Sequence, residues 1–228
     1  MMNCKKLAFG SLTFWLWISS VTYGDLISWD VNTAIPDGEA TGLQNTQTIS
    51  GLQEQITSLE VHLKIQPLSG ELVWNGDYYV SLQHDSGFSV LLNRVGKTAA
   101  DPLGASDNGF DIIFSLTGGD IHSYESQSPT YGANGELTGT WGVDGRDVDP
   151  DLVLDTDSQT AMLSSFMGLD PNGEWTLFVA DMNSGGKGQL SSWGLNIEAV
   201  PEPAAVLLVL LGGGVTLLTR RFSNLREA

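Results

Sequence analysis

A strict alternation of apolar and polar residues from 59 to 66 is the feature that most constrains the fold of this chain. The apolar members are Leu59, Val61, Leu63 and Ile65. A period of two places alternate side chains on opposite faces of a β-strand, whereas an amphipathic helix needs a period near 3.6. Pro67 follows, and because proline cannot donate a backbone hydrogen bond, we expect the strand to end there. The pattern predicts a half-buried strand.

Shorter apolar runs between turn-rich segments predict further strands. They cover residues 78–83, 88–93, 110–116, 175–180 and 193–197. The His-Asp-Ser-Gly segment between the first two of these runs favours a hairpin. We expect an edge strand and loops in residues 25–55, and one short helix in residues 160–167. Many short strands without a long amphipathic helix predict an all-β fold, either an antiparallel β-sandwich or a jelly roll.

The N-terminal end has the pattern of a secretory signal peptide. Two lysines precede an apolar run at residues 7–18, and Thr22 and Gly24 are small residues that suit cleavage. Residues 1–24 are therefore predicted to direct the chain to the Sec export machinery, with an uncleaved anchor as the alternative. The single cysteine, Cys4, lies in this segment, so the exported domain would have no disulfide.

The C-terminal end, residues 200–228, combines a short motif, an apolar stretch at 204–219 and a basic pair. The motif and basic residues are Val200, Pro201, Glu202, Pro203, Arg220 and Arg221. Sixteen helical residues span about 24 Å, less than a hydrocarbon core of about 30 Å. The arginines indicate a cytoplasmic flank, with the bulk of the chain on the other side of the membrane.

The order of these parts resembles the PEP-CTERM sorting signal. The resemblance implies a bacterial exported protein that is held transiently in the inner membrane and recognised by an exosortase. It further implies a destination at the cell surface or in the extracellular matrix, often with exopolysaccharide or biofilm. A permanent C-terminal anchor is the alternative.

The exported part is strongly acidic. Residues 25–200 contain five Lys and Arg against 25 Asp and Glu, a net charge of −20. Nucleic acid is a poor partner for such a domain, because phosphate binding needs clustered basic residues. The acidity favours either solubility through self-repulsion or the binding of divalent cations.

A second resemblance covers residues 43–199. Trp175 and Trp193 each lead an apolar strand, and a turn with three glycines at 181–188 connects them. This closing pattern, with Gly76-Asp77-Tyr-Tyr-Val-Ser-Leu upstream, is similar to the P domain of proprotein convertases, also called P/Homo B. The resemblance implies a jelly-roll β-sandwich of the kind that stabilises a subtilisin-like serine protease. The family's catalytic residues belong to a separate domain, so none is transferred to this chain.

Catalysis is not expected from the residue types that are available. Serine proteolysis needs a nucleophile, a histidine and an orienting carboxylate. The three histidines are His62 on a polar strand face, His84 in the predicted hairpin turn and His122 near a predicted loop. No Gly-x-Ser-x-Gly turn occurs in the sequence. We expect a protein that is not an enzyme.

Two acidic segments are candidates for a Ca²⁺ site, because this ion takes six to eight oxygen ligands. The residues are Asp147, Asp149 and Asp151 in one segment, and Asp107 and Asp111 with Asp77 in the other. Leu152 and Ser158 stand where an EF-hand requires glycine and glutamate, so the first segment is not an EF-hand. A solvated acidic loop is the alternative to a calcium site.

Carbohydrate binding would require exposed aromatic side chains. The aromatic candidates are Trp74, Tyr78, Tyr79, Tyr124, Tyr131 and Trp141. Most aromatic residues of a sandwich lie in the core, and Trp74 and Tyr131 stand in turn-rich segments that favour exposure. The sequence therefore favours a structural or interaction protein of the cell surface or matrix. A module that binds extracellular polysaccharide or another surface protein, and a P domain that supports a protease in trans, are the alternatives.

Overall fold

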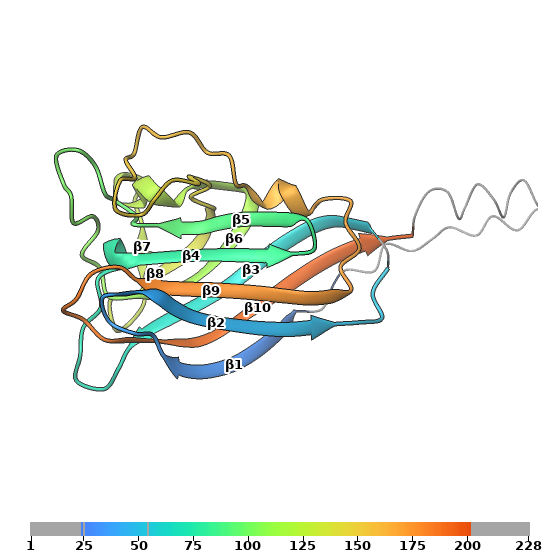
Figure 1. Ribbon diagram of the computed structural model, residues 1–228, viewed down its shortest axis with the longest axis horizontal. Helices are drawn as coiled ribbons and strands as arrows, with labels where there is room; N and C mark the ends of the chain where they lie inside the picture. Colours follow the sequence, from blue (N-terminus) through green and yellow to red (C-terminus); the bar gives the residue numbers. More distant parts are fainter. Residues whose placement is uncertain (1–23, 25, 54, 202–228) are drawn as a thin grey trace, which may run out of the picture.

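The structure, a computed structural model, describes residue 24 and residues 26–53 and 55–201. The larger sheet contains β1 (Ile27–Ala34), β3 (Gln55–Pro67), β6 (Phe110–Asp120), β7 (Thr130–Tyr131), β8 (Leu137–Gly142) and β10 (Gly188–Val200). The smaller sheet contains β2 (Glu39–Ile49), β4 (Tyr78–His84), β5 (Gly87–Asn93) and β9 (Gly173–Asp181). Their orders are β1-β10-β3-β6-β8-β7 and β2-β9-β4-β5. The two sheets lie one behind the other (Figure 1), so the predicted all-β class is confirmed.

Period-two alternation builds the core between the sheets. In β3, Leu59, Val61, Leu63 and Ile65 are all at most 1% exposed. Trp175 of β9 and Trp193 of β10 are also buried, as the two tryptophan-led strands predicted. Each alternate residue of these strands therefore contributes to one apolar layer, which is the main source of stability in a sandwich.

The end of β3 at Pro67 agrees with the sequence, and the hairpin strands each extend one residue further into the turn than expected, but three regions differ. The expected helix at 160–167 is wrong in extent, because only the 3₁₀ turn η3 (Leu163–Phe166) forms. The backbone N–H groups of Thr160 and Ala161 instead donate to the carbonyl oxygen of Gly145, and that of Val90 donates to the carbonyl of Ala161. The carbonyl of Ala161 would accept from the N–H of residue 165 in an α-helix, but it is paired with Val90, so the first helical turn does not form.

The polar N-terminal segment also differs, since it forms two strands. β1 pairs with β10 and β2 pairs with β9, each at the edge of its sheet. An edge strand was expected within residues 25–55, and this segment supplies an edge strand to each sheet. The third difference is that β6 and β8 pair in parallel, whereas every other named pair is antiparallel.

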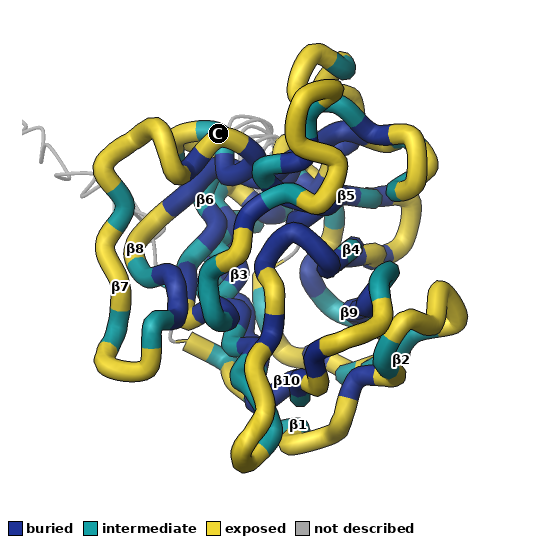
Figure 2. Tube along the Cα trace, turned by 90° about the vertical axis from the view of Figure 1, so that its left-hand side faces the viewer, coloured by how far each residue is buried: buried dark blue, intermediate teal, exposed yellow. Residues whose placement is uncertain are grey.

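The loops gather at one end of the sandwich, and β10 leaves at the other (Figure 1). Figure 2 looks onto the loop end, where exposed segments surround a buried centre. Among the described residues, no helix is long and apolar enough to cross a membrane. The predicted span at 204–219, the signal peptide apart from Gly24, and the sorting residues after Pro201 lie outside the described residues.

Candidate functional site

A pocket of about 600 Å³ opens at the loop end and is called here the end pocket. It lies between η1 (Asn75–Asp77), the loop after β5 and the loop that joins β9 to β10. Its main lining residues are Trp74, Asp77, Asp101, Leu103, Asn183 and Ser184. Its volume falls in the range of about 300–1,000 Å³ that is typical of ligand pockets.

One buried asparagine fixes two walls of the end pocket. Asn75 is fully buried; its side-chain Oδ1 accepts from the backbone N–H of Gly109 at 2.8 Å, and its Nδ2 donates to the Gly109 carbonyl at 3.1 Å. Its backbone N–H donates to the carbonyl of Asp107. Next to it, a Cβ on Gly76 would lie 2.4 Å from the carbonyl oxygen of Leu103. Glycine at 76 therefore lets the Leu103 loop lie directly against η1.

Asp77 lines the end pocket, and the buried carboxylate of Asp181 lies behind the pocket wall. In β9, Trp175, Leu177 and Val179 face the core, and the same alternation puts Asp181 on that apolar face at 3% exposure. Asn183 donates its Nδ2 to Asp77 Oδ1 at 2.7 Å and its backbone N–H to Asp181 Oδ1 at 3.3 Å. These hydrogen bonds join β9 to η1 across the pocket.

Burial and mutual repulsion disfavour the charged forms of both acids. Burial, followed by the charge of Asp77, raises the pKa of Asp181 to about 7. The pKa of Asp77 is raised chiefly by burial, and the charge of Asp37 adds to the effect. Tyr78 lies among these carboxylates, and its buried hydroxyl has no hydrogen-bond partner among the described residues. The carboxylates of the site thus carry more negative charge than the nearby cations neutralise.

The nearest cation compensates for this charge incompletely. Arg94 is buried, and its guanidinium lies 3.8 Å from Asp77 while its Nε donates to the carbonyl of Gly76. Within the part of the chain that the structure describes, Asp37, Asp101 and Asp181 have no ion pair. The end pocket therefore keeps a net negative character.

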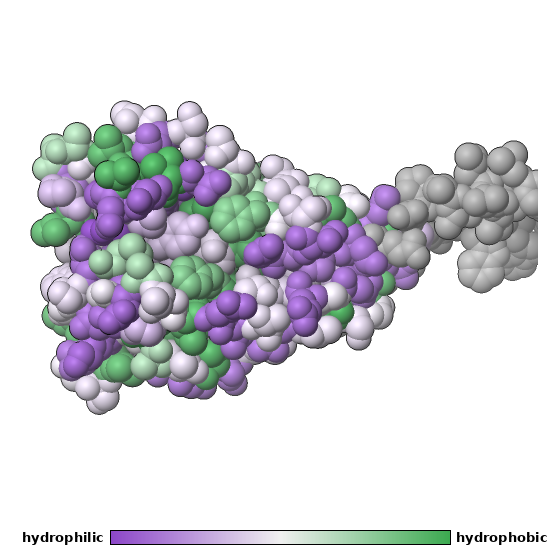
Figure 3. Space-filling view, viewed as in Figure 1, coloured by the Kyte–Doolittle hydropathy of each residue, from purple (hydrophilic) through white to green (hydrophobic). Residues whose placement is uncertain are grey.

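Exposed apolar side chains accompany the acids at this end. Leu72 is 54% exposed, Trp74 is 38% exposed and Leu103 is 69% exposed. Figure 3 shows hydrophobic and hydrophilic residues intermixed over the loop end. Tyr131, the other aromatic candidate, is also exposed, and its hydroxyl donates to Asp107. Large exposed apolar residues around a pocket are typical of a binding surface.

The acidic loop, residues 144–157, is held to the sandwich by two buried cations, although among the described residues only Asp144 of its six aspartates forms an ion pair. Arg146 is 5% exposed and donates to Asp144 Oδ1 at 3.1 Å, to Asp120 Oδ2 at 2.9 Å and to the carbonyl of Asp155. The Lys97 ammonium donates to the carbonyls of Pro150 and Asp151 at 3.0 and 2.6 Å. Buried cations thus fasten the loop to the sandwich.

The residues of the calcium hypothesis are not brought into one cluster. Asp107 accepts from the hydroxyls of Tyr124 and Tyr131, and Asp111 pairs with Lys64 at 2.7 Å. Asp77 lines the end pocket, and Asp147, Asp149 and Asp151 are exposed on the acidic loop. Over the described ranges, no group of three or more His, Cys, Asp or Glu residues has the geometry of a metal site. Calcium binding stays a prediction.

Two histidines are buried: His84 ends β4 and does not lie in the hairpin turn, which corrects that expectation, whereas His122 lies in the connecting segment η2 (Ile121–Ser126), near the predicted loop. His84 follows the alternation of β4 onto the core face, where its ring stacks on Trp175 with centroids 4.1 Å apart. Its two ring nitrogens contact the carbonyls of Glu174 and Asp170. His62 is half-buried on β3, and burial lowers its pKa.

His122 is also buried, with Nδ1 2.7 Å from Asp144 Oδ2 and Nε2 2.9 Å from the Lys97 carbonyl. Burial is the largest influence and disfavours the charged ring. The hydrogen bond and charge of Asp144, with the Lys97 carbonyl, outweigh it and raise the pKa of His122. Although this is a histidine–carboxylate pair, its second nitrogen is held by the backbone and not by a nucleophile.

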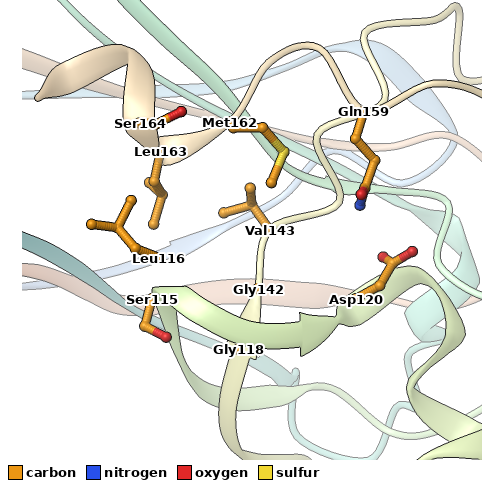
Figure 4. A pocket seen from close by; sticks show the side chains of 10 residues that line it. All are labelled: Ser115, Leu116, Gly118, Asp120, Gly142, Val143, Gln159, Met162, Leu163 and Ser164. Atoms are coloured by element: carbon orange, nitrogen blue, oxygen red, sulfur yellow. The ribbon is translucent and has the colours of Figure 1, made fainter.

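A smaller cavity of about 170 Å³ lies beside the acidic loop (Figure 4). Leu116, Val143, Met162 and Leu163 line it, with Asp120 and Gln159 at one side. Both carboxylate oxygens of Asp120 accept from Arg146, so the polar side of this cavity is already paired. The larger and less compensated end pocket is the stronger candidate site.

Sequence reasoning found Trp74 and Asp77 but missed Asp101, Leu103, Asn183 and Asp181. Asp181 had a readable signal, since it continues the alternation Trp175-x-Leu-x-Val-x-Asp onto the core face. Leu103 and Asp101 lie in an irregular loop, where spacing carries no information about direction. Their placement depends on the contact of Gly76 with that loop.

The sequence profile of one family and several solved structures match parts of this chain. The sequence profile of the proprotein convertase P-domain matches residues 151–197, a range that contains η3, β9 and most of β10. A search of curated proteins finds no match.

Among solved structures, the complex of the Aeromonas sobria serine protease with the chaperone ORF2 has 15% identity and a TM-score of 0.44. That match covers 81% of this chain and 28% of the other chain. The Aeromonas sobria serine protease gives 14% identity, a TM-score of 0.43, and coverages of 80% and 28%. This chain thus spans under a third of the length of those chains. Over residues 151–197, the chain is similar to the P domain of proprotein convertases.

Proposed function

We propose that this chain is an exported, non-catalytic interaction protein whose β-sandwich binds a partner protein through the end pocket. The observation that carries the proposal is the group of exposed apolar side chains, Leu72, Trp74 and Leu103, beside an incompletely compensated acidic pocket. Exposed tryptophan and leucine side chains at the rim of a pocket favour a protein partner, because burying them on binding is favourable.

The side-chain contacts support a non-catalytic role. The ring nitrogens of His84 and His122 contact backbone carbonyls and the carboxylate of Asp144. A histidine held on both sides has no nitrogen with which to take a proton from a nucleophile. We also propose that the sandwich has the strand connections of a jelly roll. The protein would act at the cell surface or in the extracellular matrix.

Export and sorting follow from the two ends of the sequence. The signal peptide would direct export, and the PEP-CTERM-like tail would be recognised by an exosortase. In Figure 1 the loop end lies opposite the point where β10 leaves the sandwich, so a domain attached through its C-terminal side would present the end pocket outward.

Cell fractionation with intact-mass measurement tests this localisation. We expect the protein outside the cytoplasm, with a mass that lacks residues 1–24 and the tail from near Pro201. A full-length chain in the cytoplasm would contradict export, and a full-length tail in the inner membrane would contradict sorting and release.

Support of a subtilisin-like serine endopeptidase in trans is the second candidate, and the P-domain match at 151–197 favours it. Co-expression of this chain with such a protease from the same source tests it. The candidate predicts a longer half-life of protease activity at elevated temperature. An unchanged half-life would reject it and leave the broader interaction role in place.

A further inference from the structure

We propose that the end pocket recognises a lysine or arginine side chain of its partner, flanked in the partner's sequence by an apolar residue. This inference rests on the proposed interaction role and names the chemistry of the partner. It combines three features of the same pocket: its volume, its apolar rim and its uncompensated carboxylates.

The rim provides the apolar half of the recognition. Trp74 and Leu103 line the pocket, and Leu72 lies two residues before Trp74 at the same end. An indole face can stack on a guanidinium or pack on the aliphatic stem of lysine. An apolar residue next to the cation could then cover Leu103, which is exposed by 69%.

The pocket wall provides the charged half. Asp77 and Asp101 line it, and Asp181 and Asp37 lie close enough to Asp77 to add to its repulsion. Arg94, the cation nearest to Asp77, also donates to the carbonyl of Gly76. A partner's cation would relieve the repulsion among these acids, because opposite charges attract strongly in a partly desolvated site.

Most basic residues of the domain are already engaged, so the balancing charge would come from a partner. Lys64, Arg94, Lys97 and Arg146 contact other groups of the fold through their side chains, and the fifth, Lys187, is exposed in the loop between β9 and β10. A second copy of this domain would bring a net charge of −20 to the same surface and would be repelled. A neutral sugar would cover the aromatic rim and leave the acids uncompensated.

Selection from a displayed library of random heptapeptides tests the inference. The full-length chain is the target, and selection is carried out at low and at high salt. We expect enrichment of peptides that carry lysine or arginine beside an apolar residue, with weaker binding at high salt.

Matched variants locate the binding. The double variant Asp77→Asn with Asp101→Asn should weaken the selected peptides by about tenfold or more. The control Asp30→Asn with Asp85→Asn removes the same charge from exposed positions outside the pocket and should leave affinity within about twofold. Asp101→Asn alone, in an exposed loop, serves as the second variant if the double variant unfolds.

The outcomes test the recognition of a cation separately from the interaction role of the end pocket. Enrichment of cationic peptides that depend on Asp77 and Asp101 supports the inference. Enrichment of apolar peptides without a cation, or equal binding by variant and control, overturns it and leaves the interaction role standing. If Trp74→Ala with Leu103→Ser also has no effect on the selected peptides, or no peptide is enriched, the proposed role of the end pocket is overturned as well.

Discussion

The acidic loop and the end pocket both concentrate carboxylates, but they differ in how buried cations engage them. In the loop, the guanidinium of Arg146 and the ammonium of Lys97 bind carboxylates and carbonyls from inside the fold. In the end pocket, Arg94 lies 3.8 Å from Asp77, and Asp181 has a raised pKa. Buried cations hold the acidic loop to the sandwich, whereas the carboxylates of the end pocket stay available to a partner.

Arg146→Met removes a buried cation from the acidic loop and should cause the largest loss of stability. It leaves Asp144, which is fully buried, without its guanidinium partner. Loss of one member of a buried pair costs about 3–5 kcal/mol of unfolding free energy. Chemical denaturation measures this loss, and exposed Lys187→Met is the control that should cost at most about 0.5 kcal/mol. A loss for Arg146→Met no larger than that of the control would show that the loop is not held by this charge.

Asp181→Asn removes the uncompensated charge and should change the pH dependence of stability. The pKa of Asp181 is raised to about 7 in the folded state, so the folded protein binds this proton more tightly than the unfolded chain does. The stabilisation that comes from this tighter proton binding is fully present below pH about 4. It is lost as the pH rises to about 7. The variant should lack this loss and gain up to about 4 kcal/mol over the parent at pH 8.

Urea denaturation of both proteins from pH 4 to pH 8 measures the difference. His122 also has a raised pKa and adds a loss of stability as the pH rises above about 6.5, which is common to both proteins. Parallel curves for the parent and Asp181→Asn would contradict the account of the end pocket.

Lys97→Met tests the second anchor of the acidic loop. The variant removes the ammonium that donates to the carbonyls of Pro150 and Asp151. We expect a loss of about 1–3 kcal/mol, the cost of leaving polar groups without partners. Limited proteolysis should cut residues 147–157 earlier than in the parent. Unchanged cleavage would show that Lys97 does not fasten the loop.

The calcium hypothesis predicts a higher unfolding midpoint with millimolar calcium than with a chelator. At ten times its dissociation constant, the ion would stabilise the folded state by about 1.4 kcal/mol. The calcium-induced shift of the midpoint is then measured in the loop variant Asp147→Asn with Asp149→Asn and in the pocket variant Asp77→Asn. The variant that loses the shift shows which region binds the ion. Equal midpoints for the parent with and without calcium would reject the hypothesis.

Trp74→Ala with Leu103→Ser should have the smallest effect on stability. Leu103 is 69% exposed but Trp74 only 38%, so we expect a loss of about 1 kcal/mol, most of it from Trp74. Binding of a selected cationic peptide should nevertheless fall. A large loss of stability would show that the rim is a structural cover and not a binding surface.

The regular parts of the fold could be predicted because period-two alternation is a local property. It indicated β3 and the strands that contain Trp175 and Trp193, and the His-Asp-Ser-Gly segment indicated the hairpin between β4 and β5. It failed at residues 160–167, where backbone pairing with Gly145 replaces the expected helix. Long-range pairing of that kind leaves no local signature.

The candidate site was less predictable because it is assembled from separate loops. Trp74 was identified as an exposed aromatic residue, and Asp77 as an acid at a strand end. The contribution of Asp101 and Leu103 depends on Gly76 and Asn75, which bring a loop near residue 105 against η1. His84 was assigned to a turn because Asp85-Ser86-Gly87 follow it, whereas the strand continues one residue further onto the core face.

Hydrogen exchange with mass spectrometry, with and without a selected cationic peptide, tests the central claim most directly. The full-length chain should show slower exchange in residues 72–77, 101–106 and 181–185 when the peptide is bound, because these segments form the end pocket. Exchange in the acidic loop, residues 144–157, should not change. Protection confined to the acidic loop, or absent from the three pocket segments, would contradict the division of roles between the two regions.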